Sequence, residues 1–198
     1  MKKLPTHKVL KIKPKEYLEQ GFSHCGAYAV KGILSAFDLD DKTHPKYYHP
    51  HWFGRLTGWT LGKNYYVNIL RSYGINATRG SVEYLSGKEK IEFLKQNLSQ
   101  DKPIMIRIGN GYLTDTYNPI LGKLVSHWIT LWGYDDEKEL FYVYDSGLRK
   151  KHWNSRLPIG NTTRTYHEIL RDWGFGLWQP IYWLTVGRDN YLYVCLKS

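Results

Sequence analysis

The chain has 198 residues, of which 42% are hydrophobic and 23% charged, and these proportions exclude a largely disordered or fibrous protein. Lysine and arginine exceed aspartate and glutamate by 28 to 18, which gives a formal net charge of +10, and aromatic residues make up 16%. Two cysteines, Cys25 and Cys195, are too few for a disulfide scaffold or a four-cysteine zinc site.

Helices are predicted mainly in the first half of the chain. Apolar residues recur at helical spacing over Cys25–Phe37, Asn64–Tyr73 and Lys88–Leu98. Ser23 occupies a possible N-cap position for the first of these helices. The stretch Thr43–Gly62 is rich in Pro, His, Gly and Trp, which indicates a loop with short helical pieces.

After Pro103 the period changes, and strands are predicted. Ile104, Ile106 and Ile108 alternate with other residues, and further strands are expected over 126–134 and 140–144. A short helix over Tyr166–Gly174 and a closing hairpin of 183–186 with 191–196 complete the set. We therefore expect an α+β protein of one domain, 1–198. Residues 1–100 would form a mainly helical lobe and 101–198 a mainly β lobe, with a cleft between them.

Cys25 is the first candidate for chemistry. It lies at the predicted N-terminus of a helix, where unpaired N–H groups and the helix dipole favour a thiolate. A thiolate is the form that a nucleophilic cysteine needs. The alternative is a small, buried hydrophobic residue with no chemical role.

His127 and Asp145 flank a predicted hairpin with an acidic turn. If the turn centres on Asp136, His127 lies directly opposite Asp145 on the same face of the sheet. A carboxylate there holds one imidazole nitrogen and leaves the other free to act as a base. A register error of one residue would separate them to opposite faces, which leaves a solvated polar pair as the alternative.

Several short motifs, in this order, resemble those of the papain-like cysteine peptidases. The resemblance is greatest to the branch that contains the bacteriocin-processing, double-glycine-leader peptidases and their stand-alone relatives. It spans about residues 17–175. The motifs are Gln20-Gly-Phe-Ser-His-Cys-Gly26, Lys102-Pro-Ile-Met-Ile106, Ser126-His-Trp-Ile-Thr-Leu-Trp-Gly-Tyr-Asp135, Val143-Tyr-Asp-Ser-Gly147 and Thr165-Tyr-His-Glu-Ile-Leu-Arg-Asp-Trp173.

The resemblance implies a papain-like fold and a thiol hydrolase that cleaves a peptide or amide bond. It assigns Cys25 as nucleophile, His127 as base, Asp145 as the orienting acid and Gln20 as the donor to the oxyanion. It implies no metal and no organic cofactor. Two features depart from the family. His24 stands where an acidic or small polar residue is more common, and the spacing from Gln20 to Cys25 is about one residue shorter than in papain-type enzymes.

Other functions stay open at this stage. The same three residues would serve an acyltransferase of the transglutaminase or arylamine acetyltransferase kind, and a non-catalytic binding module could keep the fold. The basic charge is spread along the chain, so we expect no sequence-specific nucleic-acid binding, although it could favour an acidic peptide or protein substrate. His44, His49 and His51 match no strong zinc spacing.

The location of the protein is a separate expectation. No apolar run resembles a signal peptide or a membrane span, which favours a cytoplasmic protein unless a leader has been removed. In an exported protein, a bridge between Cys25 and Cys195 would be possible, but it would consume the nucleophile.

Overall fold

A single antiparallel sheet organises the protein. The computed structural model describes residues 4–21, 23–40, 42–60, 62–111, 116–174 and 190–197. Within them the strands follow the order β2-β7-β3-β4-β5-β6, and β1 pairs with β4. Their bounds are β1 (His7–Val9), β2 (Ala77–Ser81), β3 (Ile104–Gly109), β4 (Ser126–Asp135), β5 (Leu140–Tyr144), β6 (Thr162–Thr165) and β7 (Leu192–Leu196).

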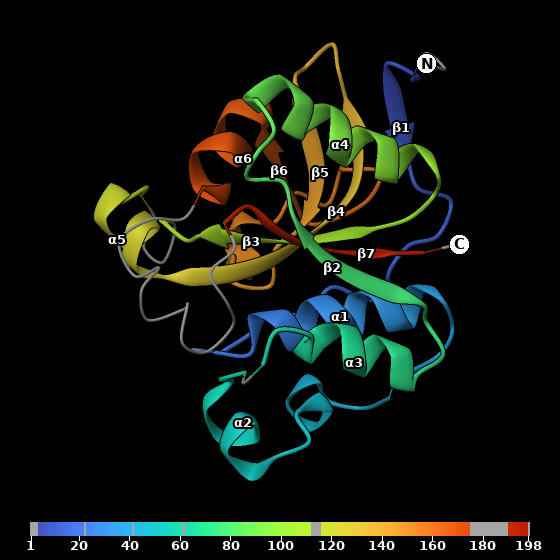
Figure 1. The fold of residues 1–198 in the computed structure, drawn as a ribbon, viewed down its shortest axis with the longest axis vertical. Helices are drawn as coiled ribbons and strands as arrows, with labels where there is room; N and C mark the ends of the chain where they lie inside the picture. The colour runs from blue at the N-terminus through green and yellow to red at the C-terminus, as the bar shows by residue number, and fades with distance from the viewer. Residues whose placement is uncertain are drawn as a thin grey trace.

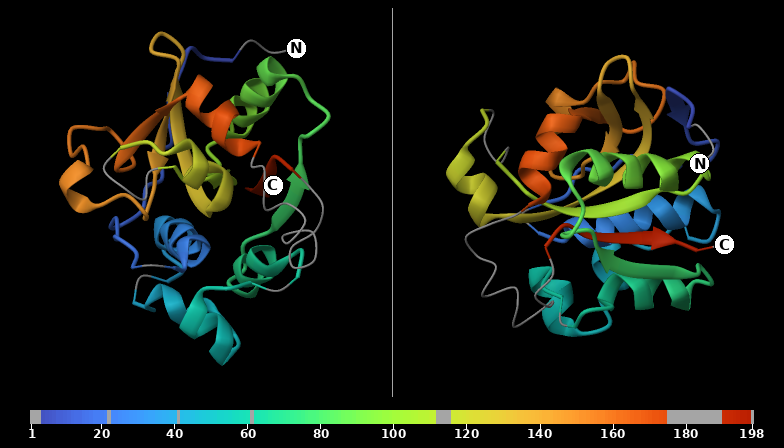
Figure 2. Two further views of the ribbon diagram at one scale, coloured as in Figure 1. Left: turned by 90° about the vertical axis from the view of Figure 1, so that its left-hand side faces the viewer. Right: turned by 45° about the horizontal axis from the view of Figure 1, so that its top comes forward.

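Helices cover both faces of this sheet. Helices α4 and α6 lie on one face and α1 on the other, with α3 packed against α1 (Figures 1 and 2). Because both faces are covered, every residue of β3 is buried. The helices are α1 (Cys25–Ala36), α2 (Trp52–Thr57), α3 (Tyr65–Ser72), α4 (Gly87–Ser99), α5 (Pro119–Leu124) and α6 (Tyr166–Trp173), with short 3₁₀ helices at Pro45–Tyr48 and Lys150–His152.

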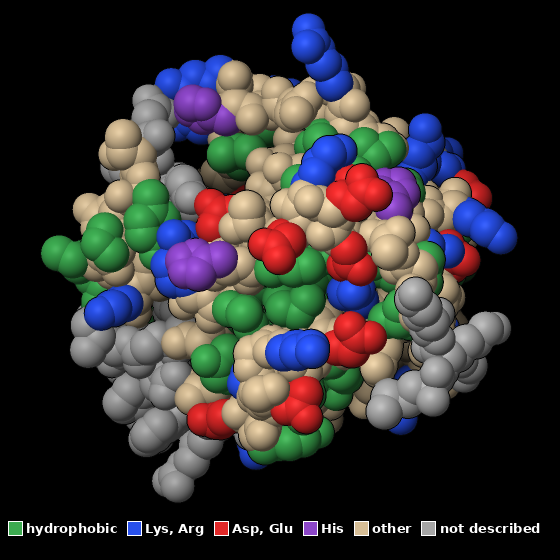
Figure 3. All heavy atoms as spheres, turned by 90° about the horizontal axis from the view of Figure 1, so that it is seen from above, with side chains coloured by type: hydrophobic (Ala, Val, Ile, Leu, Met, Phe, Trp, Pro, Cys, Tyr) green, Lys and Arg blue, Asp and Glu red, His purple; other side chains and the backbone are tan. Residues whose placement is uncertain are grey.

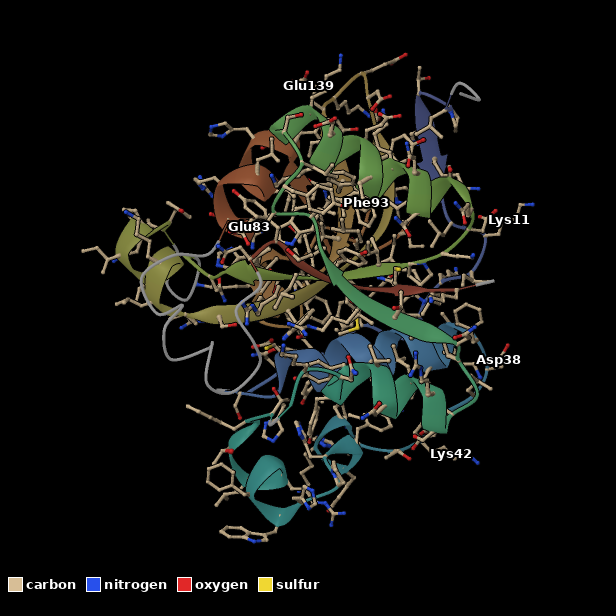
Figure 4. The ribbon with its side chains drawn as sticks, in the orientation of Figure 1. Lys11, Asp38, Lys42, Glu83, Phe93 and Glu139 are labelled. Atoms are coloured by element: carbon tan, nitrogen blue, oxygen red, sulfur yellow. The ribbon has the colours of Figure 1, made fainter. Side chains whose placement is uncertain are left out.

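Local sequence explains where the two helices on the upper face begin. Ser86 caps α4 and Thr165 caps α6, and in each case a glutamate three residues later bonds back to the capping residue. This reciprocal arrangement is the capping box, which satisfies two of the N–H groups left free at a helix start. Phe93 of α4 lies between the helix and the sheet, where its ring meets Tyr193 of β7 at 4.6 Å between centroids (Figure 4).

The α+β class is confirmed, and the long predicted elements lie within one or two residues of their observed bounds. The pieces that the sequence did not predict are β1, β2, β6 and α5. These are short, and β2 and β6 carry mixed polar sequences without clear alternation. The predicted hairpin over 183–196 falls partly outside the described residues. The second strand of that predicted hairpin is β7, which lies between β2 and β3 and pairs with both.

The β4–β5 hairpin departs from the predicted register. Next to the turn, Asp135 pairs with Leu140, whereas a turn centred on Asp136 would pair it with Glu137, so the register is shifted by three residues. Further from the turn, Thr130 pairs with Tyr144 and not with Tyr142, a shift of two residues. A β-bulge between Leu131 and Gly133 accounts for the difference. An error of two residues preserves the face of the sheet, whereas an error of three would have reversed it. The direct His127–Asp145 pairing was therefore wrong, but the bulge keeps both residues on one face.

The surface carries both signs of charge. On the face above α4 and α6, basic and acidic side chains are interspersed (Figure 3). Among the described residues, none of the helices is both long and apolar enough to cross a membrane.

Candidate active site

Cys25 is the first residue of α1, and its thiol is surrounded by donors. His127 lines the same cavity, and the interaction with His127 and with the backbone N–H groups of Trp128 and Gly26 lowers the pKa of the thiol. Gly26 belongs to the first turn of α1, and Trp128 belongs to β4. The helix start and the strand thus meet beside Cys25, a partly exposed residue.

The N-cap of α1 is His24 and not Ser23. His24 adopts a left-handed conformation (φ 77°) and makes no side-chain capping bond. Its ring is instead fixed from both sides. Nδ1 lies 2.6 Å from the Ser23 hydroxyl, and Nε2 lies 3.0 Å from the carbonyl oxygen of Arg55. The departure from the family pattern at His24 therefore ties the residue before Cys25 to α2.

Gly26 is required by a close contact. A Cβ atom at this position would lie 2.0 Å from Cζ and 2.1 Å from Oη of Tyr66, a buried residue of α3. The Tyr66 ring meets Trp128 edge-on at 5.4 Å. Tyr66 therefore packs directly against the helix start and against the strand residue whose N–H faces the sulfur.

His127 and Asp145 form a buried pair. Nε2 of His127 lies 2.7 Å from Oδ1 of Asp145, and both residues are 2% exposed. The N–H of Gly147 donates to the same oxygen at 2.9 Å. With Nε2 held in this way, Nδ1 is the imidazole nitrogen left to face Cys25.

The ionisation of these groups follows from their contacts. Burial alone raises the pKa of the Cys25 thiol, but the hydrogen bond and positive charge of His127 outweigh it and lower that pKa. Burial alone lowers the pKa of His127, yet the charge of Asp145 raises it to about 10. The pKa of Asp145 is depressed despite its burial, chiefly by His127 and Arg164. The arrangement favours a thiolate paired with an imidazolium at neutral pH.

Gln20 lies beside these residues and is held through Ser146. The Ser146 hydroxyl donates to Oε1 of Gln20 at 2.7 Å, and the Gln20 N–H donates to the Ser146 carbonyl at 2.8 Å. Since Oε1 is the acceptor in this bond, the amide NH₂ of Gln20 is oriented away from Ser146 and can donate elsewhere.

A cavity of about 350 Å³ contains these groups. Cys25, His127 and Gln20 line it together with Trp59, Tyr66, Arg107, Asn110 and Trp128. A larger cavity of about 740 Å³ lies next to it between the Pro45–Tyr48 turn, α2 and α3, and Trp59 lines both. Aromatic residues contribute to the wall of the larger cavity, but Cys25 and His127 lie in the smaller one, which is the candidate active site.

Two polar residues near the site were missed at the level of sequence. Arg164 of β6 donates from Nη2 to Oδ2 of Asp145 at 2.9 Å, and Asn161 brackets the Asp145 backbone with bonds of 2.9 and 2.8 Å. Neither lies in a hydrophobic pattern or a motif. The available signal was a charged residue in the run Thr162-Thr-Arg-Thr165, which directly precedes the helix predicted from Tyr166.

The remaining candidates have ordinary structural environments. His49 is fully buried and bonds through Nδ1 to the Tyr65 hydroxyl at 2.7 Å, while His44 caps the Pro45–Tyr48 turn. Cys25 and Cys195 are both free thiols. Cys195 is buried in β7, and that burial raises its pKa.

Comparison with known proteins finds solved structures of similar fold. A crystal structure of a C39-like peptidase from Bacillus anthracis matches with a TM-score of 0.56 and 8% identity over 98% of each chain, a likeness of fold. A double glycine motif protease from an AMS/PCAT transporter, solved with its leader peptide, gives a TM-score of 0.48 and 12% identity over 98% of this chain and 100% of that one. No curated protein matches the sequence.

The family model supplies the sequence evidence that these distant structures lack. The model of the Peptidase_C39 like family matches residues 23–171, about three quarters of the chain, and that range includes Cys25, His127 and Asp145. The expected papain-like fold is confirmed by the sheet, the helices and these matches together. The chain belongs to the Peptidase_C39 like family.

Proposed function

We propose that the protein is a thiol hydrolase that cleaves a peptide or amide bond through Cys25, His127 and Asp145. The observation that carries the proposal is that Cys25 and His127 line one cavity, with His127 hydrogen-bonded to the buried carboxylate of Asp145. A low thiol pKa beside an imidazolium is the state that a nucleophilic cysteine requires.

The first half of the reaction forms an acyl-enzyme. The Cys25 thiolate attacks the carbonyl carbon of the substrate and forms a C–S bond, while the C=O electron pair moves to oxygen. The Cys25 N–H and the Gln20 amide donate to this oxyanion. The tetrahedral intermediate then expels the amine, which takes its proton from Nδ1 of His127, and a thioester remains.

Hydrolysis completes the cycle. Neutral His127 takes a proton from water, and the resulting hydroxide attacks the thioester carbonyl. Collapse of the second intermediate releases the carboxylic acid and the Cys25 thiolate, so that the thiolate and imidazolium are regenerated. Asp145 remains ionised throughout and keeps Nδ1 of His127 directed at the reacting atoms.

Peptide cleavage by matched cysteine variants tests this proposal. A fluorescence-quenched peptide library is incubated with the wild type, Cys25→Ala and Cys195→Ala, and products are identified by mass spectrometry. We expect cleavage by the wild type and Cys195→Ala and none by Cys25→Ala. Turnover that survives in Cys25→Ala would overturn the assignment of the nucleophile.

Adding an amine nucleophile to the same reactions decides between hydrolysis and acyl transfer. A hydrolase yields mainly the free acid, because water accepts the acyl group. Predominant formation of the amide with the added amine would instead identify an acyltransferase that uses the same three residues.

A further inference from the structure

The Asp145 carboxylate has two charged partners, and only one of them is His127. Oδ1 accepts hydrogen bonds from His127 and from the Gly147 N–H, whereas Oδ2 accepts from Nη2 of Arg164 at 2.9 Å. Arg164 is 5% exposed, so this contact is shielded from water. A guanidinium bonded to a buried carboxylate holds it both charged and fixed in rotation.

Arg164 is itself held by a second acid. Its Nη1 lies 3.8 Å from Oδ2 of Asp172, a buried residue of α6. Asp172 also accepts from Nε of Arg171 at 2.8 Å and from the Tyr117 hydroxyl at 3.1 Å. Positive and negative groups therefore alternate from the imidazole of His127 to the surface of α6.

Topology explains how a residue of β6 reaches the site. Arg164 lies opposite Phe141 in the β5–β6 pair, several residues before Asp145, and its long side chain extends to the end of β5. A shorter residue at this position would leave Asp145 without its second charge partner. The contact thus depends on the length of the arginine side chain, and the fork of the guanidinium lets Nη2 bond Asp145 while Nη1 faces Asp172.

We propose that Arg164 is a positioning residue of the candidate active site, whose guanidinium fixes the carboxylate that orients His127 and sets the pH range in which the Cys25–His127 ion pair exists. This inference rests on the proposed function. Arg164 is not among the described residues that line the cavity, and its bond to Asp145 is the route by which it acts on His127.

Electrostatics gives the proposal a definite sign. Removing a positive charge raises the pKa of every titratable group near it. A protonated imidazole is then no longer repelled by that charge, and a carboxylate or thiolate is no longer attracted to it. The charged and titratable groups facing the Asp145–His127 pair are Cys25 of α1, Tyr66 of α3, Arg107 of β3, Tyr144 of β5, Arg164 of β6, and Asp172 and Arg171 of α6. Of these, only Arg164 is a cation bonded to Asp145 itself.

Three variants of the full chain test the inference. Arg164→Met removes the charge, Arg164→Lys keeps the charge but removes the fork, and Arg71→Met is the matched control. Arg71 also uses two guanidinium nitrogens, at 3.1 and 2.9 Å, but binds the Ala77 carbonyl outside the site. The readouts are the rate of Cys25 alkylation by iodoacetamide from about pH 4 to 10, peptide turnover, and the melting temperature.

We expect the alkylation profile of Arg164→Met to move upward by about one pH unit, and that of Arg71→Met to stay in place. Arg164→Lys should keep the wild-type alkylation profile, because the positive charge remains. We expect its kcat to fall about tenfold at unchanged KM, because a lysine ammonium does not fix the orientation of the Asp145 carboxylate. If Arg164→Met does not fold, the split between kcat and KM in Arg164→Lys decides the question.

An unmoved profile in folded Arg164→Met, or wild-type kcat in Arg164→Lys, would overturn the role of Arg164 and leave the proposed function intact. A wild type whose Cys25 is alkylated no faster than Cys195 at every pH would overturn the proposed function and, with it, this inference. The two failures are therefore distinguishable within one set of measurements.

Discussion

Replacing Gly26 by alanine sets two effects against each other at the start of α1. Alanine within a helix is ordinarily favoured over glycine by about 1 kcal/mol. Here the new Cβ would lie 2.0 Å from Cζ of Tyr66, well inside van der Waals contact, and Tyr66 is buried against Trp128. Overpacking of a filled core costs about 1–3 kcal/mol, so after subtracting the helix preference we expect a net loss of about 1 kcal/mol.

Thermal and chemical unfolding measure this loss. A change of about 1 kcal/mol in a chain of this size lowers the melting temperature by about 2–4 °C. Gly87→Ala in α4 is the control, since its Cβ would meet only the Leu170 side chain, at 3.4 Å, and should leave stability unchanged or increase it. We also expect slower alkylation of Cys25 in Gly26→Ala, because Tyr66 and Trp128 are displaced beside the sulfur.

A second substitution tests the cause directly. Tyr66→Leu removes the ring atoms that the new Cβ would meet, so Gly26→Ala should cost less in that background, with a coupling energy of about 1 kcal/mol or more. Gly26→Ala with wild-type or higher stability and unchanged alkylation would refute the packing of Tyr66 on the helix start.

Three further predictions concern the other residues of the site. Gly147→Ala would place Cβ 2.9 Å from Cε1 of His127, and we expect kcat to fall with little change in KM; unchanged kcat would contradict the described geometry. Gln20→Ala should lower kcat by about 10²–10³-fold, and Ser146→Ala by less, because it only releases the Gln20 amide; an equal and small effect of both would remove Gln20 from the oxyanion site. Because the pKa of His127 is raised from 6.5 to about 10, its contribution to stability is complete below about pH 6.5 and is lost as the pH rises through about 10. Denaturant midpoints of the wild type and His127→Gln should therefore converge over that interval, and a constant difference would refute the raised pKa.

The fate of the His127–Asp145 prediction shows what sequence patterns can determine. Alternation identified both strands and the face on which the two residues lie, because the period of a strand is a local property. The position of the turn and the bulge beside Trp132 are set by pairing with other strands, and no local pattern reveals an extra residue. The pairing of the two side chains survived because the error amounted to an even number of residues.

Other features depended on contacts between distant parts of the chain. Ser23 matched the preference for an N-cap, but His24 takes that position because α2 and Ser23 fix its ring. Arg164 carries no motif, and its role depends on β6 lying beside β5. Gln20 was a weak candidate from its place five residues before Cys25 and from the resemblance, and the bond from Ser146 supplies a local reason for its orientation.

Selective alkylation of Cys25 tests the central claim most directly. The wild type and His127→Ala are treated briefly with iodoacetamide at about pH 6, and the modified cysteine is identified by peptide mapping. We predict rapid modification of Cys25 in the wild type, slow modification in His127→Ala, and an unmodified Cys195, whose burial raises its pKa, in both. Equal labelling of Cys25 in the two proteins, or no preference for Cys25 over Cys195, would contradict a thiolate held by His127.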